Sequence, residues 1–296
     1  MLQFKEITLA DKSIIQRFTL INNRRNCDLT FANLYSWSFL YRSEYAVAHD
    51  ALFFRFYEGE ELRYMLPVTA QITSEVLCAM EADALRLQQP LVIAGVCADT
   101  IALIETLMPE KFVFESDRDY ADYIYDTSDL AGLMGKKYQG KRNHVNQFKN
   151  KHPDYRFTPL SSDLISDCLR LEEQWCNAHD AAHRRALEME RISMIRALKE
   201  MDSLDIVGSV LWVKDNIAAF TYGAPINQIT FDICVEKADT SIDGVYAMIN
   251  HEMANLLFPQ YRFLNREEDL GIEGLRRSKL SYHPLQLLEK FTARLK

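Results

Sequence analysis

Residues 265–284 read NREEDLGIEGLRRSKLSYHP, and no other stretch of the chain brings so many ionisable and aromatic groups next to paired glycines. The acids at 267–269 precede Gly271 and Gly274, and most of the cations follow. This order favours a short helix, because acids stabilise the N-terminal end of a helix dipole and cations its C-terminal end. The apolar lead-in YRFLN, 261–265, has the pattern of a buried strand. Polar groups that converge on a strand end are candidates for a binding site.

Three further segments resemble a known protein family. They are LMGKKYQGKRNHVNQFK at 133–149, FTYGAPI at 220–226 and TFANLYSW at 30–37. Together with residues 265–284, they resemble the soluble relatives of the C-terminal domain of bacterial phosphatidylglycerol lysyltransferases. The resemblance covers nearly the whole chain. It implies two tandem GNAT-type acyltransferase folds, like those of the Fem-type aminoacyltransferases that use aminoacyl-tRNA. The motifs are specific to the family and much less specific to a reaction.

Length and composition bound the possible classes of protein. The 296 residues, 48% of them hydrophobic, suffice for two cores, since single cores stop growing at roughly 250–300 residues. A net charge of −8 argues against broad attraction to nucleic acid or anionic lipid. The six cysteines include no C-x-x-C pair, which is typical of a reduced cytoplasmic protein. No signal peptide or run of about 18–20 uncharged apolar residues is evident, so we expect no integral membrane segment.

The order of apolar segments predicts an α+β protein in two similar halves, and the resemblance implies that these are two tandem GNAT-like domains. Each is expected to hold a mixed, mainly antiparallel sheet flanked by helices. We place the first domain at 1–128, a basic connecting helix at 129–153, and the second domain with the candidate active site at 154–296. Residues 120–126 are predicted to be a closing strand of the first domain, and residues 285–295 one long closing strand of the second.

The connecting segment is unusually basic for a chain with a negative net charge. No acid occurs between Gly135 and Pro153, and three cations there are candidate contacts for a donor: Lys137, Lys141 and Arg142. Lys137, Lys141 and His144 follow at i, i+4 and i+7, so they would share one helical face. One interpretation is a solvated linker helix. The other is an anion track for a phosphate-bearing donor such as tRNA or coenzyme A.

The EKADTSIDGVYAMIN stretch at 236–250 is the second candidate site for a donor. The resemblance implies that it joins a strand to a helix where GNAT acetyltransferases hold the pyrophosphate of coenzyme A, since a helix N-terminus is an anion site. The chain departs from that pattern, because Asp239 and Asp243 would repel phosphate unless they cap the helix. The candidate contacts here are Lys237, Thr240, Ser241 and Gly244.

Acyl transfer requires a base for the attacking group and stabilisation of an oxyanion. Glu267 and Asp269 are candidates for the base or for orienting an ammonium group, and Lys279 and Tyr282 for the oxyanion or leaving group. Arg266 and Arg276 are candidates for holding donor phosphate. Residues 265–284 resemble the family motif at nine positions: Asn265, Arg266, Glu267, Asp269, Gly271, Gly274, Arg276, Lys279 and Tyr282. The alternative is an interlocked ion-pair network that only fixes a loop.

These observations lead to one predicted function and one alternative. The chain is expected to move an aminoacyl or acyl group from aminoacyl-tRNA or acyl-coenzyme A to an amine or hydroxyl on a small molecule or peptide. The groove for this reaction is expected between the meander and helix of the second half. The alternative is a non-catalytic GNAT-like binding protein. We expect no tightly bound cofactor and no metal, because His179 and His183 lack a third ligand at a useful spacing. Nothing in the sequence indicates an oligomeric state.

Overall fold

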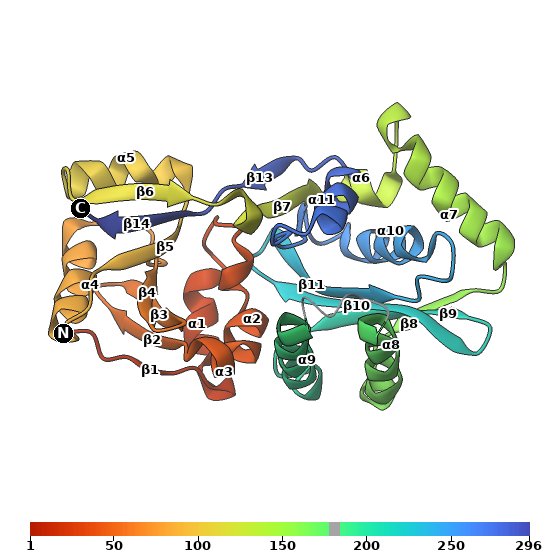
Figure 1. Ribbon diagram of the computed structural model, residues 1–296, viewed down its shortest axis with the longest axis horizontal. Helices are drawn as coiled ribbons and strands as arrows, with labels where there is room; N and C mark the ends of the chain where they lie inside the picture. The colour runs from red at the N-terminus through yellow and green to blue at the C-terminus, as the bar shows by residue number, and fades with distance from the viewer. Residues whose placement is uncertain (178–183) are drawn as a thin grey trace.

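The computed structural model describes residues 1–177 and 184–296, which form two α+β halves side by side (Figure 1). Each half is built on a seven-stranded mixed sheet, and both chain termini lie in the first half (Figure 1). The predicted fold class is confirmed by this architecture. His179 and His183 lie outside the described residues. Among those described, no helix has the length and apolar character needed to cross a membrane.

The first sheet is an antiparallel meander extended by a parallel strand. Its strands, in spatial order, are β1 (Lys5–Glu6), β2 (Glu44–Ala48), β3 (Ala51–Glu58), β4 (Glu61–Met65), β5 (Val92–Val96), β14 (Phe291–Leu295) and β6 (Phe112–Ser116). The helices of this half are α1 (Lys12–Thr19), α2 (Phe31–Ser36), α3 (Ser38–Tyr41), α4 (Ser74–Arg86) and α5 (Ala98–Leu107), and its short 3-10 helices are η1 (Leu9–Asp11), η2 (Cys27–Leu29) and η3 (Arg118–Tyr120). The apolar faces of α4 and α5 pack with this sheet in one core, as the periodicity of their sequences requires.

The second half repeats this plan. Its strands, in spatial order, are β13 (Gln286–Leu288), β7 (Asp122–Asp126), β12 (Phe263–Asn265), β11 (Thr230–Ala238), β10 (Asn216–Pro225), β9 (Val207–Val213) and β8 (Arg156–Pro159). The helices are α6 (Thr127–Gly132), α7 (Gln139–Lys151), α8 (Ile165–Asn177), α9 (Arg184–Lys199), α10 (Val245–Leu257) and α11 (Glu273–Leu280), with the 3-10 helices η4 (Lys136–Tyr138) and η5 (Ser162–Leu164). Helices α8 and α9 cover one face of the sheet, and α10 covers the other (Figure 1).

The two halves exchange strands, which the sequence analysis did not anticipate. β7 follows the first half in the chain but pairs with β12 and β13 in the second sheet. β14, the last strand, lies between β5 and β6 in the first sheet. The prediction of one long strand over 285–295 is therefore wrong, as is the assignment of residues 120–126 to the first sheet. A cut at the expected limit of 128 would separate β7 and β14 from the sheets that they complete.

The chain between α1 and β2 joins the cores of the two halves. Phe31 and Leu34 of α2 are buried in a cluster that also contains Phe220 and Tyr222 of the second half. At the neighbouring edge of the first sheet, the parallel strands β4 and β5 pair over only two residue pairs, and both end there. The carboxyl ends of parallel strands are a common place for ligand sites. The carboxyl ends of β4 and β5 in the first half therefore face the second half.

Candidate active site between the two halves

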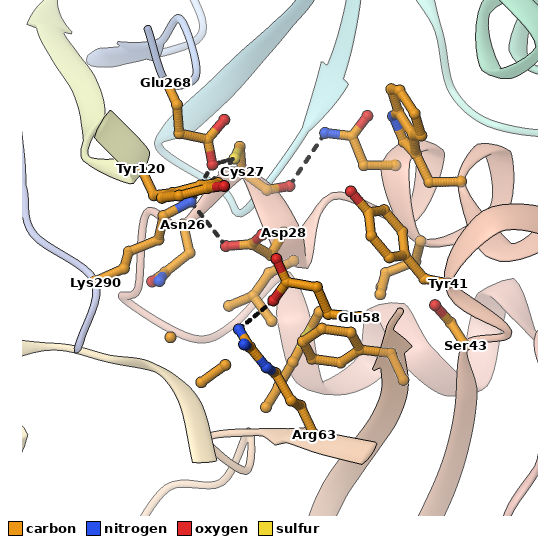
Figure 2. Close-up of a pocket in the computed structure, with 18 of the residues that line it drawn as sticks. Asn26, Cys27, Asp28, Tyr41, Ser43, Glu58, Arg63, Tyr120, Glu268 and Lys290 are labelled. Carbon is orange, nitrogen blue, oxygen red and sulfur yellow. Dashed lines mark hydrogen bonds and ion pairs between the residues drawn. The ribbon is translucent and has the colours of Figure 1, made fainter. Parts of the chain in front are cut away.

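A cavity of about 360 Å³ opens at this edge and is lined by residues from both halves (Figure 2). This volume lies within the range of small-molecule sites. The first half supplies the segment 24–43 and the ends of β3, β4 and β5, and the second half supplies the loop after β12. The groove was expected within the second half; this cavity lies between the halves instead. Its charged lining residues are Arg24, Asp28, Glu58, Arg63, Glu267, Glu268 and Lys290.

The loop after β12 has a conformation that brings two acids to the cavity. Asn265 is fully buried, and its Oδ1 accepts a hydrogen bond from the backbone N–H of Glu267 at 2.7 Å. Glu267 itself has a left-handed backbone with φ of 54°, a conformation that costs free energy in a non-glycine residue and persists only when its surroundings hold it. Here the carbonyl of Glu267 also accepts a bond from the N–H of Tyr123. The loop is thus fixed, and Glu267 and Glu268 line the cavity.

Glu267 is a carboxyl group that forms no ion pair with any of the described residues. Its Oε1 accepts a hydrogen bond from Asn33 Nδ2 at 2.9 Å, and the same amide nitrogen lies 3.0 Å from Asp232 Oδ2. Burial, with a smaller contribution from the charge of Glu268, raises the pKa of Glu267 to about 8. A carboxyl group tuned in this way holds a proton at neutral pH and can exchange it with a ligand.

Asp232 lies behind Asn33 and was missed by the sequence analysis. Thr30 Oγ1 donates to its Oδ2 at 2.9 Å, while Oδ1 has no hydrogen-bond partner among the described residues. Burial raises the pKa of this fully buried carboxyl well above its ordinary value, and the charge of Glu267 adds to the effect. The available signal was a single acid within the apolar run QITFDICV at 228–235.

Glu268 belongs to a second acidic group, in which Lys290 supplies one positive charge to three carboxyl groups. The Lys290 ammonium contacts Glu268 Oε1, lies 2.8 Å from Asp122 Oδ1 and lies 3.2 Å from Asp28 Oδ2 (Figure 2). These carboxylates hold the pKa of Lys290 well above its ordinary value, against the opposing effect of burial. The thiol of Cys27, with Asp122 and Glu268, has metal-ligand spacing. The ammonium group, 3.7 Å from the sulfur, already supplies a cation to these ligands.

A second trio with metal-ligand spacing consists of Asp232, Cys234 and Glu267. The Cys234 thiol lies 3.6 Å from Asp232 Oδ2. Burial raises the pKa of Cys234 well above its ordinary value, so it is a neutral thiol here. Metal binding requires deprotonated ligands. Burial raises the pKa of all three groups and so favours their protonated forms, although the hydrogen bond from Asn33 lowers the pKa of Glu267.

The remaining walls are aromatic, and one cation among them is unpaired. Tyr41 and Tyr120 lie on opposite sides of the cavity (Figure 2), and Trp37 and Phe56 also line it. Burial raises the pKa of Tyr41 to about 12, so its hydroxyl keeps its proton. The guanidinium of Arg24 donates twice to the carbonyl of Leu66, at 2.9 Å each, and forms no ion pair with any described residue. Burial lowers the pKa of Arg24 to about 10.

Other predicted catalytic residues lie in a closed ion-pair network beside the cavity. Asp269 is fully buried, and Arg276 binds both of its carboxylate oxygens, at 2.9 and 2.7 Å. Arg118 and the hydroxyl of Tyr123 contact the same carboxylate, at 3.1 and 2.6 Å. Hydrogen bonds from Arg276 and Tyr123 hold the pKa of Asp269 well below its ordinary value, although burial opposes them. Asp269 and Arg276 therefore fix the loop that precedes α11.

Lys279 and Tyr282 are also buried and also face away from the cavity lining. The Lys279 ammonium donates to the carbonyls of Arg266 and Glu268, so it braces the loop after β12 from behind. The ring of Tyr282 lies between two cations, with Lys141 Nζ 3.8 Å and the Arg266 guanidinium 5.0 Å from its centroid. Arg266 pairs with Glu236 at 3.0 Å. The structure thus brings together Lys141, Arg266 and Tyr282, which the sequence analysis treated as separate candidates.

The candidate donor contacts on the connecting segment have partners of their own. Lys137 pairs with Asp129 at 3.0 Å, and Arg142 donates to the carbonyls of Leu133 and Gly135. Burial lowers the pKa of Lys141 to about 8. Helix α7 lies at the end of the molecule remote from the first sheet (Figure 1).

The candidates at the start of α10 are likewise separated from the cavity. Lys237 is buried, pairs with Glu190 at 2.9 Å and stacks over the ring of Trp175. Gly244 has φ of 78°, and a Cβ there would lie 2.7 Å from the carbonyl oxygen of His144. Helix α7 therefore packs directly against the start of α10. Thr240 and Ser241 are exposed.

Comparisons with known proteins agree with this architecture. Residues 20–294 match the family described as "Phosphatidylglycerol lysyltransferase, C-terminal". A solved structure described as a conserved protein of unknown function from Bacteroides thetaiotaomicron is 51% identical, with a TM-score of 0.97 and full coverage of both chains. The structure of L-PGS from Bacillus licheniformis is 14% identical with a TM-score of 0.69, covering 96% of this chain and 91% of that one.

Two more distant matches complete the comparison. A tandem GNAT protein from the clavulanic acid biosynthesis pathway is 10% identical, with a TM-score of 0.52 and coverage of 99% and 98%. An uncharacterised protein from Mycoplasmoides gallisepticum is 23% identical over 177 residues, which is 59% of this chain and 56% of that protein. The chain thus matches little more than half of that curated relative. The structural matches establish the tandem GNAT fold.

Proposed function

The chain belongs to the phosphatidylglycerol lysyltransferase C-terminal family, and from this premise we propose that it transfers an aminoacyl or other acyl group in the cavity between its halves. The acceptor is an amine or a hydroxyl. One observation carries the proposal: Glu267, a carboxyl group with a raised pKa and no ion pair to a described residue, lines a cavity of about 360 Å³ beside two tyrosines. A proton acceptor and hydrogen-bond donors around one space are what acyl transfer needs.

The reaction follows from these groups. The acceptor nitrogen or oxygen attacks the carbonyl carbon of the donor ester or thioester, and the ionised form of Glu267 takes the proton that the acceptor loses. The hydroxyls of Tyr41 and Tyr120 are donors for the oxyanion. The carrier then leaves with the proton from Glu267, so the carboxyl group returns to its starting state. The single positive charge of Lys290 partly offsets the negative charge of Glu268 and Asp28 throughout.

The donor is either aminoacyl-tRNA or a coenzyme A thioester. The first would follow the cationic segment that contains Lys137, Lys141 and Arg142. Filter binding of aminoacyl-tRNA to a variant without these three charges tests this route, and unchanged binding would exclude it. The second would bind at the start of α10. Against it stand the buried Lys237–Glu190 pair and the packing of Gly244 on α7. Calorimetric titration with coenzyme A thioesters is the test, and no heat at millimolar ligand would exclude that site.

The test of the reaction is acyl transfer by the Glu267→Gln variant. Gln is close in shape and can still accept the hydrogen bond from Asn33, but it cannot take a proton. We expect transfer to fall by about a hundredfold or more, the usual contribution of a general base. Glu273→Gln is the matched control, because this carboxylate is 89% exposed on α11. Equal rates for Glu267→Gln and the control would remove Glu267 from the mechanism.

A non-catalytic binding protein is the second candidate function. It is favoured by one observation: Asp269, Arg276, Lys279 and Tyr282 all make internal contacts instead of lining the cavity. Under this alternative, Asp269→Asn and Lys279→Ala change stability and leave ligand binding intact. Ligand binding without any transfer to an amine or hydroxyl acceptor would favour it over catalysis.

A further inference from the structure

The cavity contains two partly buried ionisable groups of opposite sign that do not pair with each other. Among the described residues, the Arg24 guanidinium donates hydrogen bonds only to the carbonyl of Leu66, the Glu267 carboxyl accepts one only from the amide of Asn33, and neither group forms an ion pair. The other cations that line the cavity, Arg63 and Lys290, each have carboxylate partners. Burying an uncompensated ionisable group costs free energy unless a ligand supplies the missing partner.

We propose that the cavity binds a small zwitterion, an amino acid or a dipeptide, with its ammonium group against Glu267 and its carboxylate against Arg24. This inference rests on the proposed function and names the acceptor class for it. The amine of such a ligand is the group that would receive the acyl chain. A small molecule with one ammonium group and one carboxylate complements the charges of Glu267 and Arg24.

The raised pKa of Glu267 and the lowered pKa of Arg24 agree with this geometry. An ammonium group beside Glu267 favours the ionised form of the carboxyl group. A proton can then pass between the ligand nitrogen and this carboxyl group. A carboxylate beside Arg24 can form two parallel hydrogen bonds with the guanidinium, since only the two Nη donors are engaged, both on one carbonyl.

The volume of the cavity sets the scale of the ligand. Arg24 and Glu267 line the same cavity of about 360 Å³, which is near the small end of the range for small-molecule sites. The aromatic side chains of Trp37 and Tyr41 line the same cavity and can cover the apolar part of the ligand.

The experiment measures binding without turnover, so it is independent of the acyl-transfer assay. The probes are the standard L-α-amino acids, glycylglycine and alanylalanine, each tested by thermal shift and then by calorimetry at millimolar concentration. For every probe that binds, the C-terminal amide is titrated in parallel. We expect at least one zwitterion to bind, and its amide to bind about tenfold to hundredfold more weakly, the loss of a charged hydrogen-bond pair.

Variants of Arg24 test the contact with the carboxylate of the ligand. Arg24→Gln should remove the difference between a zwitterion and its amide, and Arg24→Lys should keep part of it. Arg25→Gln is the matched control, because this neighbouring arginine stacks on Phe263 and does not line the cavity. Comparing probe with amide inside each variant cancels any change in folding stability. No binding by any zwitterion, or equal binding of acid and amide to the unaltered protein, would overturn the inference. Zwitterion binding with no acyl transfer would support it and count against the proposed reaction.

Discussion

Replacing Glu267 with Gln should make the protein more stable at alkaline pH and leave its stability at acidic pH nearly unchanged. Burial raises the pKa of Glu267 from its ordinary value of 4.5 to about 8. Below pH 4.5 the carboxyl is protonated in both the folded and the unfolded chain, so it adds no pH dependence. Between pH 4.5 and 8 the unfolded chain releases the proton and the folded protein keeps it. The folded state therefore loses stability as the pH rises.

The magnitude follows from the size of the pKa change. Each pKa step is worth about 1.4 kcal/mol, so the full effect of Glu267 at pH 8 is at most about 5 kcal/mol. Because the side chain is partly exposed to the cavity, solvent screening reduces this to about 2–4 kcal/mol. Glu267→Gln removes that loss, since the amide has no proton to release. Asp232 remains in the variant and keeps a residual slope of the same sign, because burial raises its pKa as well.

Urea unfolding at a series of pH values from 5 to 8 measures the effect, with the free energy of unfolding obtained by linear extrapolation. Glu273→Gln controls for the loss of one negative charge, since its carboxylate is exposed on α11. We expect the variant and the unaltered protein to diverge by about 2–4 kcal/mol toward pH 8 and to converge near pH 5. Parallel curves across the whole range would refute a proton held by Glu267, and with it the reason for choosing this residue as the base.

Three other substitutions test the supporting contacts. Lys290→Met should destabilise the fold by about 3–5 kcal/mol, because it leaves a buried group of carboxylates without its cation; a loss below about 1 kcal/mol in urea unfolding would contradict this. Asp269→Asn should cost about 2–4 kcal/mol while zwitterion binding is retained, since the buried guanidinium contacts of this residue lie outside the cavity lining. Gly244→Ala should lower stability by about 1–3 kcal/mol, because a Cβ would meet the carbonyl of His144 at 2.7 Å and the residue has φ of 78°; an unchanged unfolding midpoint would show that α7 can shift.

Local sequence patterns predicted the secondary elements well and their partners poorly. The two meanders and the flanking helices follow from apolar periodicity, which is a property of neighbouring residues. The exchange of β7 and β14 depends on which sheet edge is nearest after folding, and no periodicity encodes that. Residues 285–295 look like one strand because apolar residues recur along them and only Glu289 and Lys290 are adjacent polar residues. In the structure, those two residues carry the chain from one sheet to the other.

The difference between local patterns and tertiary contacts also explains which site residues could be predicted from the sequence. Glu267 stands out because it lies in a dense motif. Arg24, Asp122 and Lys290 stand alone in segments far apart in the chain, and only the folded protein brings them to one place. These residues attract attention because of their contacts in the folded protein: Arg24 forms no ion pair with a described residue, and Lys290 pairs with Asp122. Composition and spacing carry no information of that kind.

The strand exchange is also the reason that the cavity joins both halves. Lys290 lies on the short link between β13 in the second sheet and β14 in the first, and its ammonium binds Asp28 of the first half and Glu268 of the second. The crossing therefore supplies the cation that holds the two sides of the cavity together. The motif at 265–284 then divides by function. Its first acids, Glu267 and Glu268, line the cavity, and its later residues fix the loop that presents them, so the conformation of this loop determines the geometry of the site.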